Sequence, residues 1–234
     1  HLEHRRQRQM CIRDSPSILI QSDARDVKKS LFLPSSPHSS QLNQDIFALI
    51  FNNFKPGFFL EIGANDGFSF SNTIYLEEEY KWQGILIEAN PSYYEKLKKR
   101  KAKISLAAIS DKEETLEFRD AGLFGGLEHT LDKSNPDKIR NKKTIKVEGK
   151  RLSSILEELE APEKIDFVSI DVEGGELEIL RQLVSMNNYQ FKCGCIEHNY
   201  RKKDKEEIKN ILLKSGFCIA WEAQTSHDFF FYKL

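Results

Sequence analysis

The apolar residues of this chain gather in short dense runs, separated by longer segments in which they recur every three or four positions. The dense runs predict strands, and the helically spaced segments predict helices between them. Strands that alternate with helices are typical of an α/β fold. The predicted strands cover residues 58–62, 85–88, 104–109, 115–118, 144–147, 165–172, 191–196, 217–221 and 229–232. The predicted helices cover residues 41–54, 70–80, 91–101, 152–159, 176–183 and 204–215.

The end of the chain fixes the direction of one strand. The predicted strands 217–221 and 229–232 are separated by too few residues for a crossover, so they must be antiparallel. The sheet is therefore expected to be mostly parallel, with a reversed strand at its end. A length of 234 residues suits one α/β domain, which we assign to residues 41–234.

Residues 1–40 are expected to be a disordered segment and linker. The part from 30 to 40 holds two prolines and five serines, a composition typical of linkers. Residues 1–15 do not begin with Met and resemble translated adaptor sequence more than a natural start, so they are treated as artefactual.

The composition excludes some partners. Lys and Arg total 35 against 36 Asp and Glu, so no net charge draws the chain to nucleic acid or to a membrane surface. No apolar run reaches the roughly 20 residues of a membrane helix. Cys193 and Cys195 lie on one face of an apolar strand, without a second pair at zinc spacing. We expect buried free thiols in a reducing, cytoplasmic setting.

The most informative segment runs from Phe58 into a turn that carries Gly63 and Gly67. Glu61 precedes the first glycine, and Glu88 ends the next predicted strand. A strand, glycine turn, helix, strand and carboxylate in this order is how a βαβ unit holds a nucleoside. The glycines let the backbone approach the ligand, and the second acid accepts the ribose hydroxyls. The alternative is that the glycines only form a turn.

A second group of acids follows the strongly apolar strand 165–172. Asp171 and Glu173 are expected on the same side of an extended segment, at the sheet edge where α/β proteins bind ligands. Two carboxylates facing one cleft suit a general base, a metal site or recognition of an ammonium group. Glu176 has a plainer role, since an acid in the first turn of a helix is favoured by the helix dipole.

Three further features are candidates for the same cleft. His198 follows the strand 191–196 at the same edge, and His129 lies in the glycine-rich loop 121–141, which is long enough for a lid or binding loop. The basic run 96–101 is expected to be a solvated helix end, with phosphate binding as the alternative.

Taken together, these motifs resemble the FkbM-type methyltransferases. The resemblance rests on FLEIGANDG at 59–67, SNT at 71–73, WQG at 82–84, IEANP at 87–91 and IDFVSIDVEG at 165–174, and it covers residues 58–234. It implies the class I fold that uses S-adenosylmethionine, a seven-stranded sheet with an antiparallel last pair and helices on both faces. It also implies methyl transfer to oxygen on small molecules, including sugars.

The resemblance also implies the roles of particular residues. Residues 61–67 would line the methionine part of S-adenosylmethionine, Glu88 would hold the ribose, and residues 108–110 would flank the adenine. The implied cofactor residues are Glu61, Gly63, Ala64, Asn65, Asp66, Gly67, Glu88, Ala89, Asn90, Ala108, Ile109 and Asp171. One departure is Ala89, where the family usually has proline.

The implied reaction needs a base for the acceptor hydroxyl. We predict that Glu173 and His198 face the acceptor while Asp171 orients it, and that no metal is required. The alternative is a metal held by these three side chains. The acceptor is expected to be a hydroxyl on a sugar, glycan or other small molecule. A nicotinamide-dependent oxidoreductase and a non-catalytic nucleoside-binding protein are the rival functions.

Overall fold

The computed structural model describes residues 40–131, 141–198, 202–221 and 227–234. The predicted segment 1–40 lies outside the described residues except for Ser40. Ser40 is buried, and its hydroxyl donates a hydrogen bond of 2.6 Å to Asp45 Oδ1. The ordered domain therefore begins no later than Ser40.

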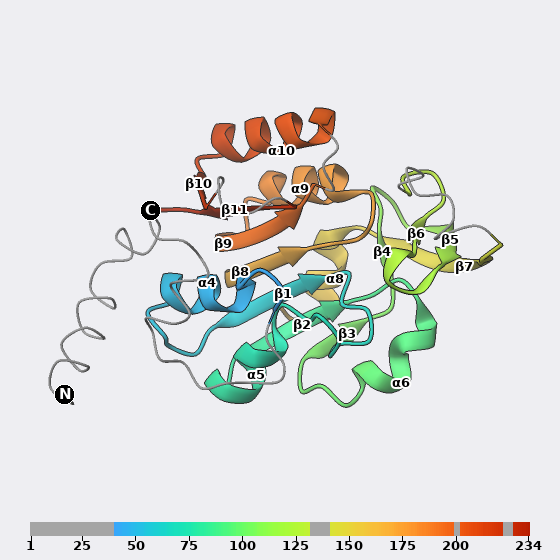
Figure 1. Cartoon of the computed structure of the whole chain (residues 1–234), viewed down its shortest axis with the longest axis horizontal. Helices are drawn as coiled ribbons and strands as arrows, with labels where there is room; N and C mark the ends of the chain where they lie inside the picture. Colours follow the sequence, from blue (N-terminus) through green and yellow to red (C-terminus); the bar gives the residue numbers. More distant parts are fainter. Residues whose placement is uncertain (1–39, 132–140, 199–201, 222–226) are drawn as a thin grey trace, which may run out of the picture.

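A seven-stranded sheet runs through the centre of the molecule in the order β10-β11-β9-β8-β1-β2-β3 (Figure 1). Only β11 is reversed, pairing antiparallel with both β9 and β10, while the other pairs are parallel. The mostly parallel sheet with a reversed strand near the end of the chain is thus confirmed. Its strands are β1 (Phe58–Ile62), β2 (Gln83–Ile87), β3 (Lys103–Ser105), β8 (Lys164–Ile170), β9 (Gln190–Glu197), β10 (Cys218–Ala220) and β11 (Asp228–Tyr232).

A second, four-stranded sheet has the order β4-β7-β5-β6. Its strands are β4 (Ala108–Ile109), β5 (Glu114–Asp120), β6 (Gly126–Leu127) and β7 (Lys143–Lys150). The prediction of one strand over 104–109 was wrong, because β3 belongs to the large sheet and β4 to the small one. Both pieces are apolar, and an unbroken apolar run does not reveal that its ends pair with different sheets.

Helices cover both faces of the large sheet (Figure 1). Side chains alternate along each strand, so Phe59 packs toward one face and Leu60 toward the other. The first face is covered by α4 (Gln44–Phe51), α5 (Ile74–Tyr80) and α6 (Tyr94–Leu97). The second is covered by α8 (Leu152–Glu158), α9 (Glu176–Ser185) and α10 (Lys202–Lys214). The short helices η1 (Pro91–Tyr93) and η2 (Gly122–Phe124) complete the elements.

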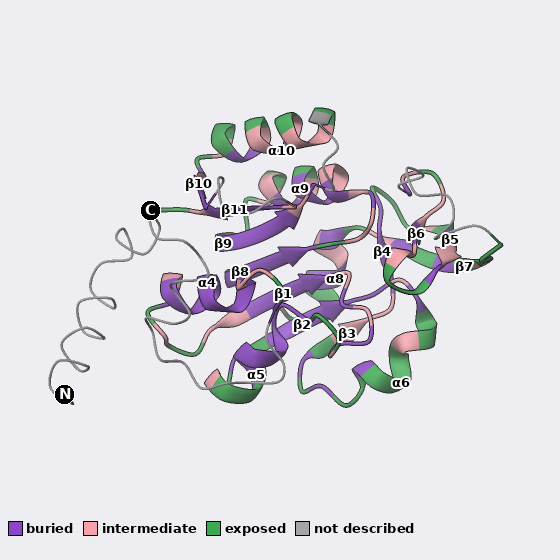
Figure 2. Ribbon diagram, in the orientation of Figure 1, coloured by how far each residue is buried: buried purple, intermediate pink, exposed green. Residues whose placement is uncertain are grey.

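Burial follows this layering, since the central strands of the large sheet are mostly buried while the outer sides of α6 and α10 are exposed (Figure 2). Cys193 and Cys195 are buried free thiols on one face of β9, as predicted. Within the described ranges, no helix combines the length and the apolar character required to cross a bilayer.

One member of the basic run 96–101 is buried at the centre of an ion-pair network. Arg100 Nε donates to Glu77 Oε1 at 3.0 Å, with side-chain exposures of 1% and 4%. Its other nitrogens donate to the Gly67 carbonyl and to the hydroxyls of Ser71 and Thr73. The prediction of a solvated run holds for its lysines and was wrong for Arg100. This guanidinium ties α5 and the segment after α6 to the glycine turn.

Candidate functional site

A cavity of about 360 Å³ opens at the carboxyl ends of β1, β2 and β8, and the small sheet lies over the same edge (Figure 1). Ligands of open α/β sheets bind at this edge, and the volume is in the range of small-molecule sites. Most of the predicted site residues line it. They are Glu61, Gly63, Ala64, Asn65, Glu88, Ala89, Ala108, Ile109, Asp171 and Glu173.

The glycine turn is fixed by its contact with the end of β8. Gly63 has φ +86, and a Cβ built on it would lie 1.6 Å from the Asp171 carbonyl oxygen. The Gly63 amide donates to the Ile87 carbonyl at 2.9 Å, and the Asp171 amide donates to the Ile62 carbonyl at 3.0 Å. Gly63 is therefore required by the protein's own packing, in addition to any approach of a ligand.

Glu88 joins the glycine turn to the end of β2. Its Oε2 accepts the Asn65 amide and its Oε1 accepts the Asn90 amide, both at 2.7 Å. Burial raises the pKa of Glu88 to about 7, although these amides oppose the rise. Each carboxylate oxygen can accept a second hydrogen bond. A held carboxylate with this capacity suits a pair of neighbouring hydroxyls.

Glu61 also lines the cavity, but its carboxylate is engaged within the protein. It accepts hydrogen bonds from the Ser71 and Thr73 hydroxyls and from the Asn72 amide at 2.8 Å. Thr73 is the residue before α5. Glu61 therefore braces the end of β1 against the start of α5.

Three predicted cofactor residues lie outside the cavity lining and form hydrogen bonds within the protein next to it. Asp66 accepts the Phe68 and Ser69 amides and Lys96 Nζ, and these donors lower its pKa although burial opposes them. Asn90 Nδ2 donates to Asp120 Oδ1 at 2.9 Å. The third is Gly67, whose carbonyl oxygen accepts a hydrogen bond from Arg100 Nη1. None of the three residues is in the cavity lining.

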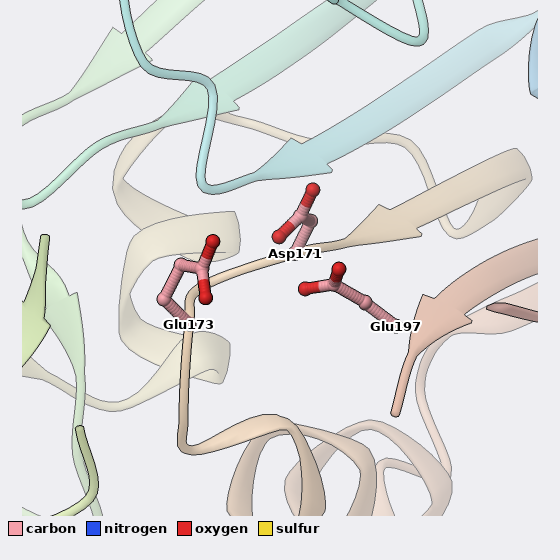
Figure 3. A group of neighbouring side chains, drawn as sticks. All are labelled: Asp171, Glu173 and Glu197. Atoms are coloured by element: carbon pink, nitrogen blue, oxygen red, sulfur yellow. The ribbon is translucent and has the colours of Figure 1, made fainter. Parts of the chain in front are cut away.

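Three carboxyl groups converge beside the cavity: Asp171 and Glu173 after β8, and Glu197 at the end of β9 (Figure 3). Their nearest oxygens lie within 4.8 Å of one another. Asp171 and Glu197 follow the paired residues Ile170 and Ile196, so the register of the parallel strands brings them together. Glu173 has φ +57, so a turn, and not the extended segment we expected, brings it to Asp171.

Asp171 and Glu197 differ in their protonation at neutral pH. Asp171 is open to the cavity, yet desolvation by the surrounding protein raises the pKa of its carboxyl group to about 6. Burial, and then the neighbouring Asp171 charge, raise the pKa of Glu197 to about 10. A hydrogen bond joins the two side chains, with Glu197 as the donor at neutral pH. Glu173, Glu61, Glu176 and Asp228 add negative charge around the pair.

His198 does not reach this group. It is 1% exposed, its ring lies 5.0 Å from that of Phe229, and it is absent from the cavity lining. Burial lowers its pKa to about 4, so the imidazole is neutral at physiological pH. The metal-assisted alternative of Asp171, Glu173 and His198 therefore lacks its nitrogen donor. The residue that sequence reasoning missed is Glu197, one position earlier.

Residues 122–130 form one wall of the cavity. They contact the turn at residues 171–175 after β8, which we call the acidic turn. Gly122 and His129 are in the lining, as the loop and histidine predictions proposed. Thr130 Oγ1 donates to the Gly174 carbonyl at 3.0 Å. A Cβ on Gly174 would lie 2.3 Å from the Thr130 carbonyl oxygen. The rest of the predicted loop, 132–140, lies outside the described residues.

Comparison with known proteins identifies a sequence family. A model described as the methyltransferase FkbM domain matches residues 61–219, most of the chain. No curated protein matches the sequence.

Several solved structures are similar to the chain. One is an FkbM methyltransferase from Methylobacillus flagellatus KT, 14% identical with TM-score 0.48, covering 76% of this chain and 44% of that one. A methyltransferase from Pyrococcus furiosus is 13% identical with TM-score 0.39, covering 94% and 98%. A putative O-methyltransferase from Klebsiella pneumoniae is 13% identical with TM-score 0.45, covering 90% and 96%. The chain thus spans less than half of the Methylobacillus structure.

Replacing Gly63 by Ala should destabilise the fold. The methyl group would overlap the Asp171 carbonyl oxygen, and overpacking of this kind costs about 3 kcal/mol or more. The matched control is Gly216→Ala, which has a similar φ of +80 but no atom within 4 Å of the new Cβ. That control should cost only about 1 kcal/mol of backbone strain. Equal losses of unfolding free energy in urea for the two variants would contradict the close approach.

Glu197→Gln should change how stability depends on pH. In the native state Glu197 keeps its proton up to about pH 10, whereas in the unfolded chain it loses the proton near pH 4.5. The proton's contribution is therefore complete below pH 4.5 and declines as the pH rises toward 10. An amide does not titrate but still donates to Asp171, so the variant should lack this decline.

The measurement is the melting temperature of both proteins between about pH 5 and pH 9. The difference in melting temperature should shift steadily in favour of the variant as the pH rises. The exposed Glu113→Gln variant serves as the control and should show no trend. A constant difference between Glu197→Gln and the natural protein across this range would show that Glu197 is ionised in the folded state.

Proposed function

This chain belongs to the FkbM methyltransferase family, and from that premise we propose that it transfers a methyl group from S-adenosylmethionine to a hydroxyl oxygen. The acceptor in this proposal is a sugar, a glycan or another small molecule. The observation that carries the proposal is the position of Glu88. It ends the strand next to the glycine turn, lines the cavity, and is held by two backbone amides.

The residues at this edge fit S-adenosylmethionine. Glu88 would accept the ribose hydroxyls, and Ala108 and Ile109 offer small apolar surfaces to an adenine. The turn from Gly63 to Asn65 would lie along the methionine part. When bound, S-adenosylmethionine supplies an electrophilic methyl carbon on a positively charged sulfur. Carboxylates on the cavity wall favour that charge.

The chain contributes position and a base. We assign the base to Asp171, because it opens on the cavity and its pKa of about 6 leaves it ionised at neutral pH. The acceptor's hydroxyl proton would pass to this carboxylate as the oxygen attacks. Glu197 holds Asp171 in place by donating a hydrogen bond, and Glu173 lies beside the acceptor. We do not assign a role in the reaction to His198, because it is outside the cavity lining.

The rival functions are less well supported. A nicotinamide-dependent oxidoreductase would be expected to carry the compact GxGxxG spacing, which Gly63 and Gly67 lack. A non-catalytic nucleoside-binding protein would not require three carboxyl groups converging beside the site. The family match favours methyl transfer over both.

Calorimetric titration with S-adenosylmethionine, S-adenosylhomocysteine and NADH tests the cofactor. The protein should bind the first two and not NADH. Glu88→Ala should weaken binding by about 1.5–3 kcal/mol, roughly tenfold to a hundredfold, because hydrogen bonds to a charged group are lost. Glu95→Ala, an exposed acid outside the cavity, is the control and should bind normally. Binding of NADH alone would sink the proposal.

Transfer of a tritiated methyl group to a panel of hydroxyl compounds tests the reaction and its base. With an accepted compound, Asp171→Asn should lower turnover by about 10²–10⁴-fold while cofactor binding survives. Glu173→Gln should have a smaller effect, and His198→Gln should leave turnover nearly unchanged. If His198→Gln abolished turnover and Asp171→Asn did not, the base would be misassigned.

A further inference from the structure

Phe70 adopts a backbone conformation that is unfavourable for a bulky residue. Its φ is +61, and its side chain is 55% exposed. Phe54 and Trp221 also have positive φ, but Phe54 packs against Tyr80, and Trp221 is buried against aromatic rings of the core. Packing offsets the strain in those two residues. No ring contact of Phe70 with the described residues offsets it there.

The conformation of Phe70 is imposed by its neighbours. On one side, the Ser69 amide and hydroxyl both donate to Asp66, at 2.7 and 3.0 Å. On the other side, the Ser71 hydroxyl donates to Glu61 at 3.0 Å and accepts from Arg100 at 3.2 Å. These hydrogen bonds, which are part-buried before Phe70 and buried after it, hold the chain on both sides of Phe70 while its ring stays exposed. Backbone strain maintained in this way is characteristic of functional positions.

The exposed ring of Phe70 is part of the cavity lining. Leu123 of η2, which is 46% exposed, lines the same cavity. Among the described residues, the other large exposed apolar side chains are Tyr94, Leu213 and Leu234, and none of them lines it. Two of these five exposed apolar side chains therefore lie where a ligand in the cavity would cover them.

The charge of the lining limits what that ligand can be. Its ionisable side chains within the described ranges are carboxyl groups, His129 and the phenol of Tyr93, without Lys or Arg. Cations do approach three of the acids from outside the lining, since Arg100 lies near Glu61, Lys112 pairs with Glu114 at 3.4 Å, and Arg181 lies 4.0 Å from Glu178. A concave wall of this composition repels phosphate and other anions.

We infer that Phe70, with Leu123, forms the contact surface for the methyl acceptor, and that the acceptor is an uncharged hydroxyl compound with an apolar face. A glycoside belongs to this class, because its sugar ring carries hydroxyl groups and has an apolar C–H face. A cyclohexanol belongs to it for the same reason. A sugar phosphate or a nucleoside diphosphate sugar does not. The inference deepens the proposed methyl transfer and rests on it.

The variant Phe70→Gly separates strain from binding. Glycine adopts positive φ readily, so the melting temperature should rise. Phe54→Gly relieves the same kind of backbone strain but removes a ring that packs against Tyr80, so its melting temperature should fall. The affinity for S-adenosylhomocysteine should remain close to that of the natural protein in Phe70→Gly.

Methyl transfer is then measured with tritiated S-adenosylmethionine. The uncharged acceptors are p-nitrophenyl glycosides and cyclohexane-1,2-diol, and the charged ones are glucose 6-phosphate and UDP-glucose. The uncharged compounds should be the better acceptors. Phe70→Gly should raise KM for them about tenfold, the loss of one ring contact, and Phe70→Trp should retain the natural KM.

Each other result contradicts one part of the account. A lower melting temperature in Phe70→Gly would show that the backbone at Phe70 is not strained, and an unchanged KM would show that Phe70 does not contact the acceptor. Failure to methylate any uncharged compound, or faster methylation of the phosphates, would overturn the acceptor class. Absence of S-adenosylhomocysteine binding in the natural protein would instead overturn the proposed function.

Discussion

The site depends on the backbone contact between the carboxyl ends of β1 and β8. At Gly63 the two strands approach so closely that a single added carbon would overlap the Asp171 carbonyl oxygen. This contact places the glycine turn directly against the acidic turn. Backbone hydrogen bonds from the Gly63 amide to Ile87 and from the Asp171 amide to Ile62 hold both turns in register. The glycine turn and a set of carboxyl groups that are far apart in the sequence therefore share one cavity.

The second support is the buried Arg100, whose guanidinium connects α5, the glycine turn and the segment after α6. Glu77 provides its counter-charge and also accepts the backbone amides of residues 101 and 102 at 3.0 Å. A buried ion pair gains little net stability over apolar packing, but removing one partner is costly. We infer that the value of this network lies in fixing one loop geometry, including the strained backbone of Phe70.

The sequence predicted the strands and the strand-end acids well, because both depend on local pattern. Glu88 was found because it ends a strand after a glycine turn. The division of 104–109 between two sheets was missed, since pairing partners are set by tertiary contacts. Glu197 was missed for a related reason. Adjacent residues of a strand point to opposite faces, and the register that brings Glu197 to Asp171 is not visible in the chain. Arg100 was hidden within a run of exposed lysines.

We propose that the cavity beside Glu88 and Asp171 binds S-adenosylmethionine. A crystal structure of the complex with S-adenosylhomocysteine tests it most directly. The account predicts that both ribose hydroxyls lie within hydrogen-bonding distance of the Glu88 carboxylate, and that the sulfur faces the group of Asp171, Glu173 and Glu197. A complex in which the nucleoside binds elsewhere, or in which Glu88 contacts no part of it, would contradict the account.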